Sequence, residues 1–399
     1  MNIIFIEVMK EIKGLTGLRG YAALWVFFLH ATWGQIGESY AMKIFRLGGS
    51  GVVIFFVLSG FILSYVYIPQ FLNKEINFMQ FIRARIARVY SLHLFILFYY
   101  VIGYYIGLYK ITLNDNLYTF FLNLGLIQSW GFTDLVSWNQ AAWSISTELF
   151  AYLLFPFYIV QLYRLNTLQL LLSIVFVIFL MTYSPYNIFI EWAKYNQLIR
   201  TNGQQFAYGL SLVQFQYIFL IGCVLFCVTD RIKKYRINFL ALYDVATLTG
   251  VSLIFYWCTF IKGDLSLIQS SIASSLIIFG ISNDTGLSKI IFGNRIIHFI
   301  GKISFSLYLS AAAIEILAKC FIYPLPLWLN LLLCISASTL LYYLIELPAQ
   351  RFILGKDMCY IDTINLYKNI NKLVSKIIQK INNGFTVILD KKKSTDILK

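Results

Sequence analysis

Arg19 and His30 are the two residues of this sequence whose types and spacing most directly allow chemistry. They lie near the two ends of the first long apolar run, LRGYAALWVFFLHA (18–31), and no charged residue separates them. Eleven steps along an α-helix are about three turns, so both side chains would share one face, about 16 Å apart along the axis. The run predicts a helix that carries a permanent cation and a titratable base on the same face. A basic flank and an interfacial histidine are the alternative, which these residues leave open.

A second group of cations occurs in FIRARIARVYSLH (81–93), where Arg83, Arg85 and Arg88 precede an apolar run. Arg85 and Arg88 are three residues apart, so one helical face can carry both. The planar guanidinium group binds two phosphate oxygens at once, which makes the cluster a candidate site for a phosphorylated donor. The alternative is the basic flank that membrane helices carry on their inner side.

A carboxylate, Glu148, occurs near the start of another apolar stretch, WSISTELFAYLLFP (143–156). Trp143 and Ser144 precede it, at a place where membrane interfaces favour tryptophan. If successive helices alternate in direction, Glu148 and His30 lie at the same outer level, and the carboxylate would orient or charge the histidine base. Alternatively, Glu148 only complements the dipole of its helix, with a nearby serine as the cap.

Two later stretches carry polar groups within apolar surroundings. GKISFSLYL (301–309) contains several serines and the phenol of Tyr308, which together give one helix a polar edge. In IELPAQR (345–351), Glu346 is predicted to form a structural ion pair with the inner arginines, and Pro348 is predicted to end the helix.

The composition determines the class of protein. Hydrophobic residues make up 59% of the chain and charged residues 13%, about half the charged share of a soluble domain. The apolar runs are continuous rather than alternating, so helices are favoured over a barrel. The sequence therefore predicts an all-α polytopic bundle of ten spans, without a removable signal peptide. The predicted spans are 15–32, 50–68, 89–109, 147–163, 168–183, 206–228, 238–260, 265–282, 301–322 and 326–345.

The net charge of +14 is explained by the membrane rather than by nucleic acid. With an inner N-terminus, 25 of the 32 lysines and arginines fall in inner segments, so both termini are predicted to be cytoplasmic. Residues 351–399 form a separate basic tail after the membrane domain (1–350). Its lysines recur every four residues opposite an apolar face, which predicts an amphipathic helix on anionic lipid, with a disordered tail as the alternative. The cysteines have no metal-ligand spacing, so no metal site is predicted.

The ordered set of motifs resembles the acyltransferase-3 family of membrane O-acyltransferases. The resemblance rests on the Arg19–His30 pair and on five stretches in the expected order, and it runs from about Gly14 to Arg351. The five stretches are GVVIFFVLSGFILS (51–64), FIRARIARVYSLH (81–93), WSISTELFAYLLFP (143–156), GKISFSLYL (301–309) and ELPAQR (346–351).

The resemblance implies transfer of an acyl group, usually acetyl from acetyl-CoA, to a hydroxyl of an extracytoplasmic carbohydrate such as O-antigen, capsule or exopolysaccharide. It also implies a bacterial cytoplasmic (inner) membrane, and no permanently bound cofactor. By motif match, Arg19, Arg83 and Arg85 would be essential, His30 would be the catalytic base, and Glu148 takes the acidic position. Two departures stand out: Ala311 occurs where many members carry histidine or tryptophan, and no fused esterase-like domain is present.

The two lines of reasoning give one hypothesis. Acetyl-CoA would be held by Arg19, Arg83, Arg85 and Arg88 on the inner side and would reach His30 through the bundle, with Glu148 nearby. Direct transfer and an acetyl-histidine intermediate both remain open. Trp143, Ser144 and Tyr308 would support the substrates. A transporter or flippase, a polysaccharide polymerase and a receptor are the alternatives from other classes.

Overall fold

The computed structural model describes residues 11–32, 39–109, 112, 114–133, 137–183, 208–234, 240–260, 266–283 and 286–355, and within these ranges it contains helices and no strands. The bounds of the helices are α1 (Lys13–Ala31), α2 (Tyr40–Arg46), η1 (Leu47–Gly49), α3 (Ser50–Leu72), α4 (Phe78–Tyr105), α5 (Leu117–Leu124), α6 (Ala142–Arg164), α7 (Thr167–Thr182), α9 (Tyr208–Lys234), α10 (Leu240–Phe260), α11 (Leu267–Ile281), α12 (Gly286–Ile291), α13 (Arg295–Lys302), α14 (Ser304–Lys319), α15 (Leu327–Leu341), η2 (Tyr342–Glu346) and α16 (Leu347–Leu354).

The predicted class of all-α polytopic membrane protein is confirmed. Six helical segments of the described chain are long and apolar enough to cross a membrane, or seven if α13 and α14, bent by 68° against each other, form one span. Every one of the ten predicted spans falls on a helix. However, α7 and α11 have only 16 and 15 residues, fewer than the roughly 20 that usually cross a bilayer. The number of ten crossings therefore stays a prediction.

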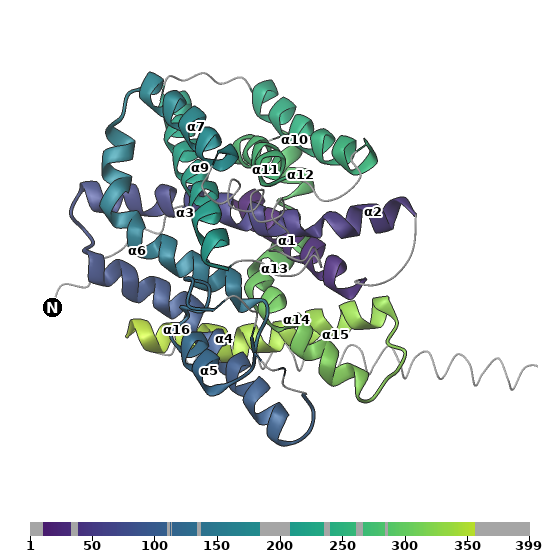
Figure 1. Ribbon diagram of the computed structural model, residues 1–399. Coiled ribbons are helices and arrows are strands. Elements are labelled where there is room, and N and C mark those ends of the chain that lie inside the picture. Colours follow the sequence, from purple (N-terminus) through teal and green to yellow (C-terminus); the bar gives the residue numbers. More distant parts are fainter. Residues whose placement is uncertain are drawn as a thin grey trace, which may run out of the picture. The chain divides into compact units, whose positions relative to one another are not determined.

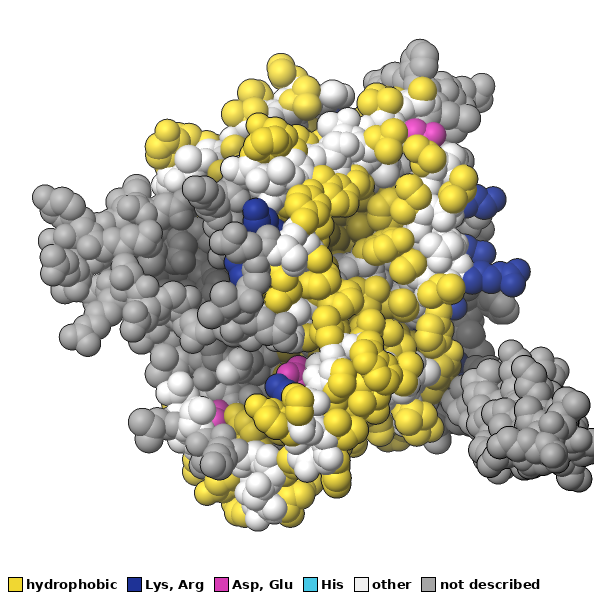
Figure 2. Space-filling model, turned by 90° about the vertical axis from the view of Figure 1, so that its right-hand side faces the viewer, with side chains coloured by type: hydrophobic (Ala, Val, Ile, Leu, Met, Phe, Trp, Pro, Cys, Tyr) yellow, Lys and Arg dark blue, Asp and Glu magenta, His cyan; other side chains and the backbone are white. Residues whose placement is uncertain are grey.

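The surface agrees with a lipid environment. Figure 2 shows one face on which hydrophobic side chains predominate, with Lys and Arg side chains mostly near its margins. Large apolar side chains such as Phe157, Leu172 and Phe176 are more than half exposed. Apolar patches this extensive are unusual on soluble monomers and are expected where lipid covers the protein.

Helix α3 is the centre of the bundle. It packs against α1, α6, α9 and α11 (Figure 1). In the apolar segment Tyr40–Leu72, which contains α3, 72% of the most apolar stretch is buried inside the protein. In the segment Leu327–Leu354, which contains α15, the buried share is only 17%. Residues on several faces of α3 are therefore fixed by neighbours, and any group that α3 presents to an internal space has a defined position.

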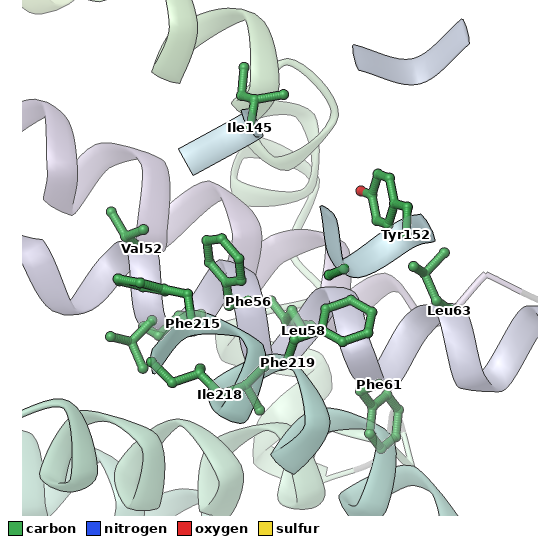
Figure 3. Close-up of a cluster of buried hydrophobic side chains, with 14 of the residues drawn as sticks. Val52, Phe56, Leu58, Phe61, Leu63, Ile145, Tyr152, Phe215, Ile218 and Phe219 are labelled. Carbon is green, nitrogen blue, oxygen red and sulfur yellow. The ribbon is translucent and has the colours of Figure 1, made fainter. Parts of the chain in front are cut away.

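The contact between α3 and α9 depends on two glycines. A Cβ atom added at Gly60 would meet the carbonyl of Phe219, and one added at Gly222 would meet the carbonyl of Val57. The two backbones can approach this closely only because both positions lack a side chain. Around them, aromatic and aliphatic side chains fill the interface (Figure 3), including Phe56 and Phe215 with ring centroids 4.7 Å apart. Gly60 therefore serves the packing of α3 against α9.

Two helices begin before the spans predicted on them. Asn77 and Gln80 form a capping box that begins α4 at Phe78, eleven residues before the predicted start at 89. The Arg83–Arg88 cluster consequently lies within the helix rather than in the loop before it. Helix α6 likewise begins at Ala142, before the predicted start at 147, and without a side-chain cap.

The end of the membrane domain also differs from the prediction, because Pro348 does not stop the helix. The turn Tyr342–Glu346 is π-helical, and the N–H of Leu347 bonds to the carbonyl of Tyr342 five residues back. The wider turn accommodates a residue that has no N–H to donate, and α16 continues to Leu354.

The chain divides into two compact units, Met1–Gln350 and Arg351–Lys399, and only residues 351–355 of the second are described. The predicted basic tail helix lies outside the described residues. The apolar stretch between α4 and α6, predicted to be re-entrant or interfacial, contains the short helix α5.

Candidate active site

A cavity lies between α1, α3, α4, α6 and α14, with about 850 Å³ of empty space that includes a region open to solvent. Helix α3 provides much of the wall, from Val52 to Leu63, which is about 16 Å along its axis. Six of the nine predicted site residues line the cavity: Arg19, Arg85, Arg88, Ser144, Glu148 and Tyr308.

Arg88 is neutralised within the protein. Its guanidinium group forms an ion pair with Glu346, a fully buried carboxylate. Glu346 also accepts a hydrogen bond from the Ser306 hydroxyl at 2.6 Å. The predicted structural ion pair of Glu346 is therefore confirmed, and Arg88 is the inner arginine that it binds.

Arg85 lies among aromatic rings. It donates a hydrogen bond to the Tyr67 hydroxyl at 2.7 Å, and its guanidinium carbon is 5.1 Å from the centre of that ring and 5.9 Å from the Tyr152 ring. Cation–π contacts of this kind fix the guanidinium plane. Arg83, two residues earlier, is exposed and does not line the cavity.

Glu148 faces the cavity from the second turn of α6. The Ser59 hydroxyl of α3 donates to its Oε1 atom at 2.5 Å. The buried Tyr152, one turn further along α6, lines the same cavity. The Ser59 hydroxyl of α3 thus positions the carboxylate of α6, because a hydrogen bond to a charged acceptor is short and directional.

Arg19 differs from the other two arginines of the cavity. The charges of Glu148, Glu346 and Arg88 all act on it. Within the described chain, however, its guanidinium group has no hydrogen bond and no ion pair with either carboxylate. Its side chain is half-buried on the cavity wall, so its N–H donors remain available to a ligand.

Of the three residues predicted to support the substrates, two are in contact with each other. Ser144 and Tyr308 share a hydrogen bond of 2.8 Å that joins the two helices at the cavity wall. Trp143 does not line the cavity, and its ring packs against Phe215 of α9 at 5.2 Å.

His30 is exposed in the last turn of α1 and is not part of the cavity lining. The carboxylate whose charge acts on it is Glu315 of α14, which also pairs with Lys319 at 2.5 Å. Glu148 accepts a hydrogen bond from Ser59 instead. Within the described chain, the structure therefore places the two predicted catalytic residues apart, with His30 near the end of α1 and Glu148 in the cavity.

The start of α6 is held by the segment that follows α5. The Trp130 indole donates to the carbonyl of Ser146 at 3.0 Å, and the Ser129 hydroxyl donates to the carbonyl of Trp143 at the same distance. These bonds restrain the turn that carries Ser144 and Glu148, and so they contribute to the geometry of the cavity wall.

Sequence reasoning missed Ser59, Tyr67 and Tyr152 as residues of the site. Ser59 stands within an apolar run with no motif around it that indicates chemistry, and the two tyrosines stand among 28 in the chain. Their proximity to Glu148 and Arg85 arises from the packing of α3, α4 and α6, which no local spacing encodes. The i,i+4 spacing of Glu148 and Tyr152 was the one available signal.

Comparison with known proteins identifies the family. The family model described as an acyltransferase domain, acyltransferase-3, matches residues 12–347. The chain belongs to the acyltransferase-3 family. The match covers every residue of the cavity, from Arg19 to Tyr308.

The chain is similar to the acyltransferase MdmB of Streptomyces mycarofaciens, with 34% identity over 160 residues. The similar region is 37% of this chain and 38% of the relative, so the chain spans well under half of that protein's length. No solved structure matches the chain.

This member of the acyltransferase-3 family has an internal site with three kinds of group. Arg19 offers unpaired donors, Glu148 is an anchored acceptor, and α3 adds apolar surface through residues such as Phe55 and Ile62. The site can bind a ligand that carries both polar and apolar parts.

Proposed function

We propose that this acyltransferase moves an acetyl group from cytoplasmic acetyl-CoA to a hydroxyl of a cell-surface carbohydrate, such as O-antigen, capsule or exopolysaccharide, on the far side of a bacterial inner membrane. The observation that carries the proposal is the cavity inside the helical bundle, lined by Arg19, Arg85, Arg88 and Glu148 from three helices. A membrane enzyme that joins substrates from opposite compartments needs such an internal site.

The donor is proposed to enter from the side of the basic residues. Arg83 is exposed on α4, two residues before the cavity-lining Arg85, so the phosphates of CoA would bind near Arg83. Guanidinium groups suit this role because they bind phosphate oxygens in pairs. The excess of basic residues in the inner segments supports cytoplasmic termini, because the cytoplasmic loops of membrane proteins are rich in lysine and arginine.

The proposed chemistry forms an ester and releases a thiol. His30 takes the proton of the acceptor hydroxyl, whose oxygen attacks the thioester carbonyl. The carbon–sulfur bond then breaks, and the proton leaves with the CoA thiol. His30 lies outside the cavity, about 16 Å from Arg19 along α1, so the donor must extend from the cavity to the end of α1.

Purified protein in sealed proteoliposomes tests the proposal. Radiolabelled acetyl-CoA is supplied on one side with lipid-linked glycan as the acceptor, and the glycan is then analysed by mass spectrometry. Acetylated glycan together with free CoA thiol is the expected result. A transporter or flippase would consume no acetyl-CoA, and a polymerase would lengthen the glycan without adding acetyl groups; either result would contradict the proposal.

A further inference from the structure

The charges of the cavity are unevenly engaged. Arg88 is paired with Glu346, and Arg85 is bound by Tyr67 and enclosed by aromatic rings. Among the cavity cations of the described chain, this leaves Arg19 as the guanidinium group without a hydrogen bond or ion pair. This guanidinium group is half-buried and faces the cavity, so its N–H donors are available to a ligand.

Glu148 is the opposite pole of the same space. Ser59 holds it, yet a carboxylate has about four acceptor positions, and one hydroxyl group does not use them all. Glu148 and Arg19 both line the cavity, and among the described residues no ion pair joins them. The cavity therefore presents a donor group and an acceptor group on its wall.

This pair of groups selects against phosphate. A phosphate at Arg19 would also face the negative charge of Glu148, and like charges in a partly desolvated site repel. A secondary amide fits better, because its carbonyl accepts from a guanidinium group while its N–H donates to a carboxylate. The apolar wall of α3 and α14, which includes Phe55, Ile62 and Phe305, suits the methylene groups on either side of an amide.

We infer that the cavity binds the neutral, amide-bearing arm of the thioester donor, with Arg19 donating to an amide carbonyl and Glu148 accepting from an amide N–H, while the donor's phosphates bind outside it. The inference rests on the proposed function, in which the donor is acetyl-CoA, whose pantetheine arm contains two secondary amides. Arg19 therefore binds a neutral amide group of the donor and not a phosphate group. The arm that passes this point continues toward His30.

Two fragments of the donor separate the possibilities. S-Acetyl-pantetheine carries the amides without phosphate, and adenosine 3′,5′-bisphosphate carries phosphates without the amides. Equilibrium binding of each fragment is measured on the purified full-length protein in detergent, for the wild type and for the variants Arg19→Met and Glu148→Ala. Arg164→Met and Glu75→Gln are the matched controls, because both residues are exposed and lie outside the cavity.

The wild type is expected to bind both fragments. Arg19→Met and Glu148→Ala should each weaken binding of S-acetyl-pantetheine by about tenfold, the effect of one lost hydrogen bond to a charged group, and leave the bisphosphate unchanged. Glu148→Gln should restore part of the loss, because its amide oxygen still accepts. The inference is overturned if Arg19→Met weakens bisphosphate binding while S-acetyl-pantetheine is unaffected, or if the wild type binds only the bisphosphate. Failure of the wild type to bind acetyl-CoA at all would instead remove the proposed function together with the inference.

Discussion

Arg88 and Glu346, 258 residues apart in the chain, form an ion pair whose two members differ in burial. The side chain of Arg88 is 25% exposed and faces the cavity, whereas that of Glu346 is fully buried. Loss of Glu346 would leave a cation that still reaches the open space of the cavity. Loss of Arg88 would leave a buried carboxylate with only the Ser306 and Gln350 side chains as partners.

This asymmetry predicts unequal costs for the two single variants. Arg88→Met should lower the free energy of unfolding by about 3–5 kcal/mol, the range for an uncompensated buried charge. Glu346→Leu should cost less, because the remaining guanidinium group can be solvated. The double variant should recover much of the loss of Arg88→Met. Denaturation in mixed micelles measures all three, and equal losses in the two single variants would contradict the burial argument.

Ser59 is predicted to be a positioning residue for Glu148. Removal of a hydrogen bond to a charged group costs about 1.5–3 kcal/mol, so Ser59→Ala should reduce kcat/KM for acetyl-CoA by roughly ten- to a hundredfold. Ser59→Thr keeps the hydroxyl group and should retain much of the activity, which a purely steric role would not predict. Kinetics of acetyl transfer measure both variants.

Ser64→Ala is the control for Ser59. It removes a hydroxyl group from the same helix, but the Ser64 hydroxyl donates to the carbonyl of Gly60 and does not line the cavity. Its kcat/KM should stay close to that of the wild type. If Ser64→Ala lost as much activity as Ser59→Ala, general disturbance of α3 would explain both, and the positioning role would be wrong.

Both the helical class and several residues of the site could be predicted from the sequence. The apolar runs predicted the class, and one cavity is lined by four of the predicted residues, Arg19, Arg85, Arg88 and Glu148. What local patterns could not provide was the pairing of charges. The partner of Arg88 is 258 residues away, and a spacing along one helix cannot indicate which guanidinium group will be neutralised by another.

The place of His30 shows the same limit from the other direction. Its helical alignment with Arg19 was inferred from period and rise, and α1 does carry both residues. The cavity nevertheless follows α3 rather than α1, because α3 is the buried centre against which the other helices pack. The expected pairing of His30 with Glu148 depended only on the alternating direction of successive helices. That alternation indicates how deep in the membrane each residue lies, but it does not indicate which residues are in contact.

Gly60 is predicted to be essential for the approach of α3 and α9. A methyl group at this position would meet the carbonyl of Phe219, so Gly60→Ala should cost about 1–3 kcal/mol, as overpacking typically does. Gly49→Ala is the matched control, because no atom lies within 4 Å of its added Cβ. Thermal unfolding in detergent distinguishes them, and a Gly60→Ala protein as stable as the control would contradict the close packing.

Glu11, just before α1, predicts a dependence of stability on pH. Burial raises its pKa, but hydrogen bonds from the Thr16 hydroxyl and the His298 ring, at 2.8 and 2.9 Å, outweigh burial and bring the pKa below the usual 4.5. A lowered pKa stabilises the folded state above about pH 4.5, and the effect is lost as the pH falls through the lowered value.

Glu11→Gln should therefore be less stable than the wild type at pH 7, and the difference should vanish as the pH falls through the lowered pKa of Glu11. Because the Glu11 side chain is 50% exposed, the difference should be at most about 0.5 kcal/mol. Unfolding of both proteins is compared across this pH range. A difference that persists undiminished in acid would show that the charge of Glu11 is not its source.

His30 and Glu148 are predicted to act on different kinetic constants, because one lies outside the cavity and the other inside it. If His30 is the base, His30→Ala should lower kcat by about 10²–10⁴, the usual contribution of general base catalysis, with little change in the KM for acetyl-CoA. If Glu148 holds the arm of the donor, Glu148→Ala should mainly raise that KM.

His298→Ala is the matched control for His30. It removes an imidazole that pairs with Glu11 at 2.9 Å and lies outside the cavity, so kcat should remain close to the wild-type value. The opposite pattern, with normal turnover in His30→Ala and a large loss of kcat in Glu148→Ala, would place the base within the cavity. The hydroxyl of the acceptor would then have to reach the anchored carboxylate of α6, and the end of α1 would have no part in the chemistry.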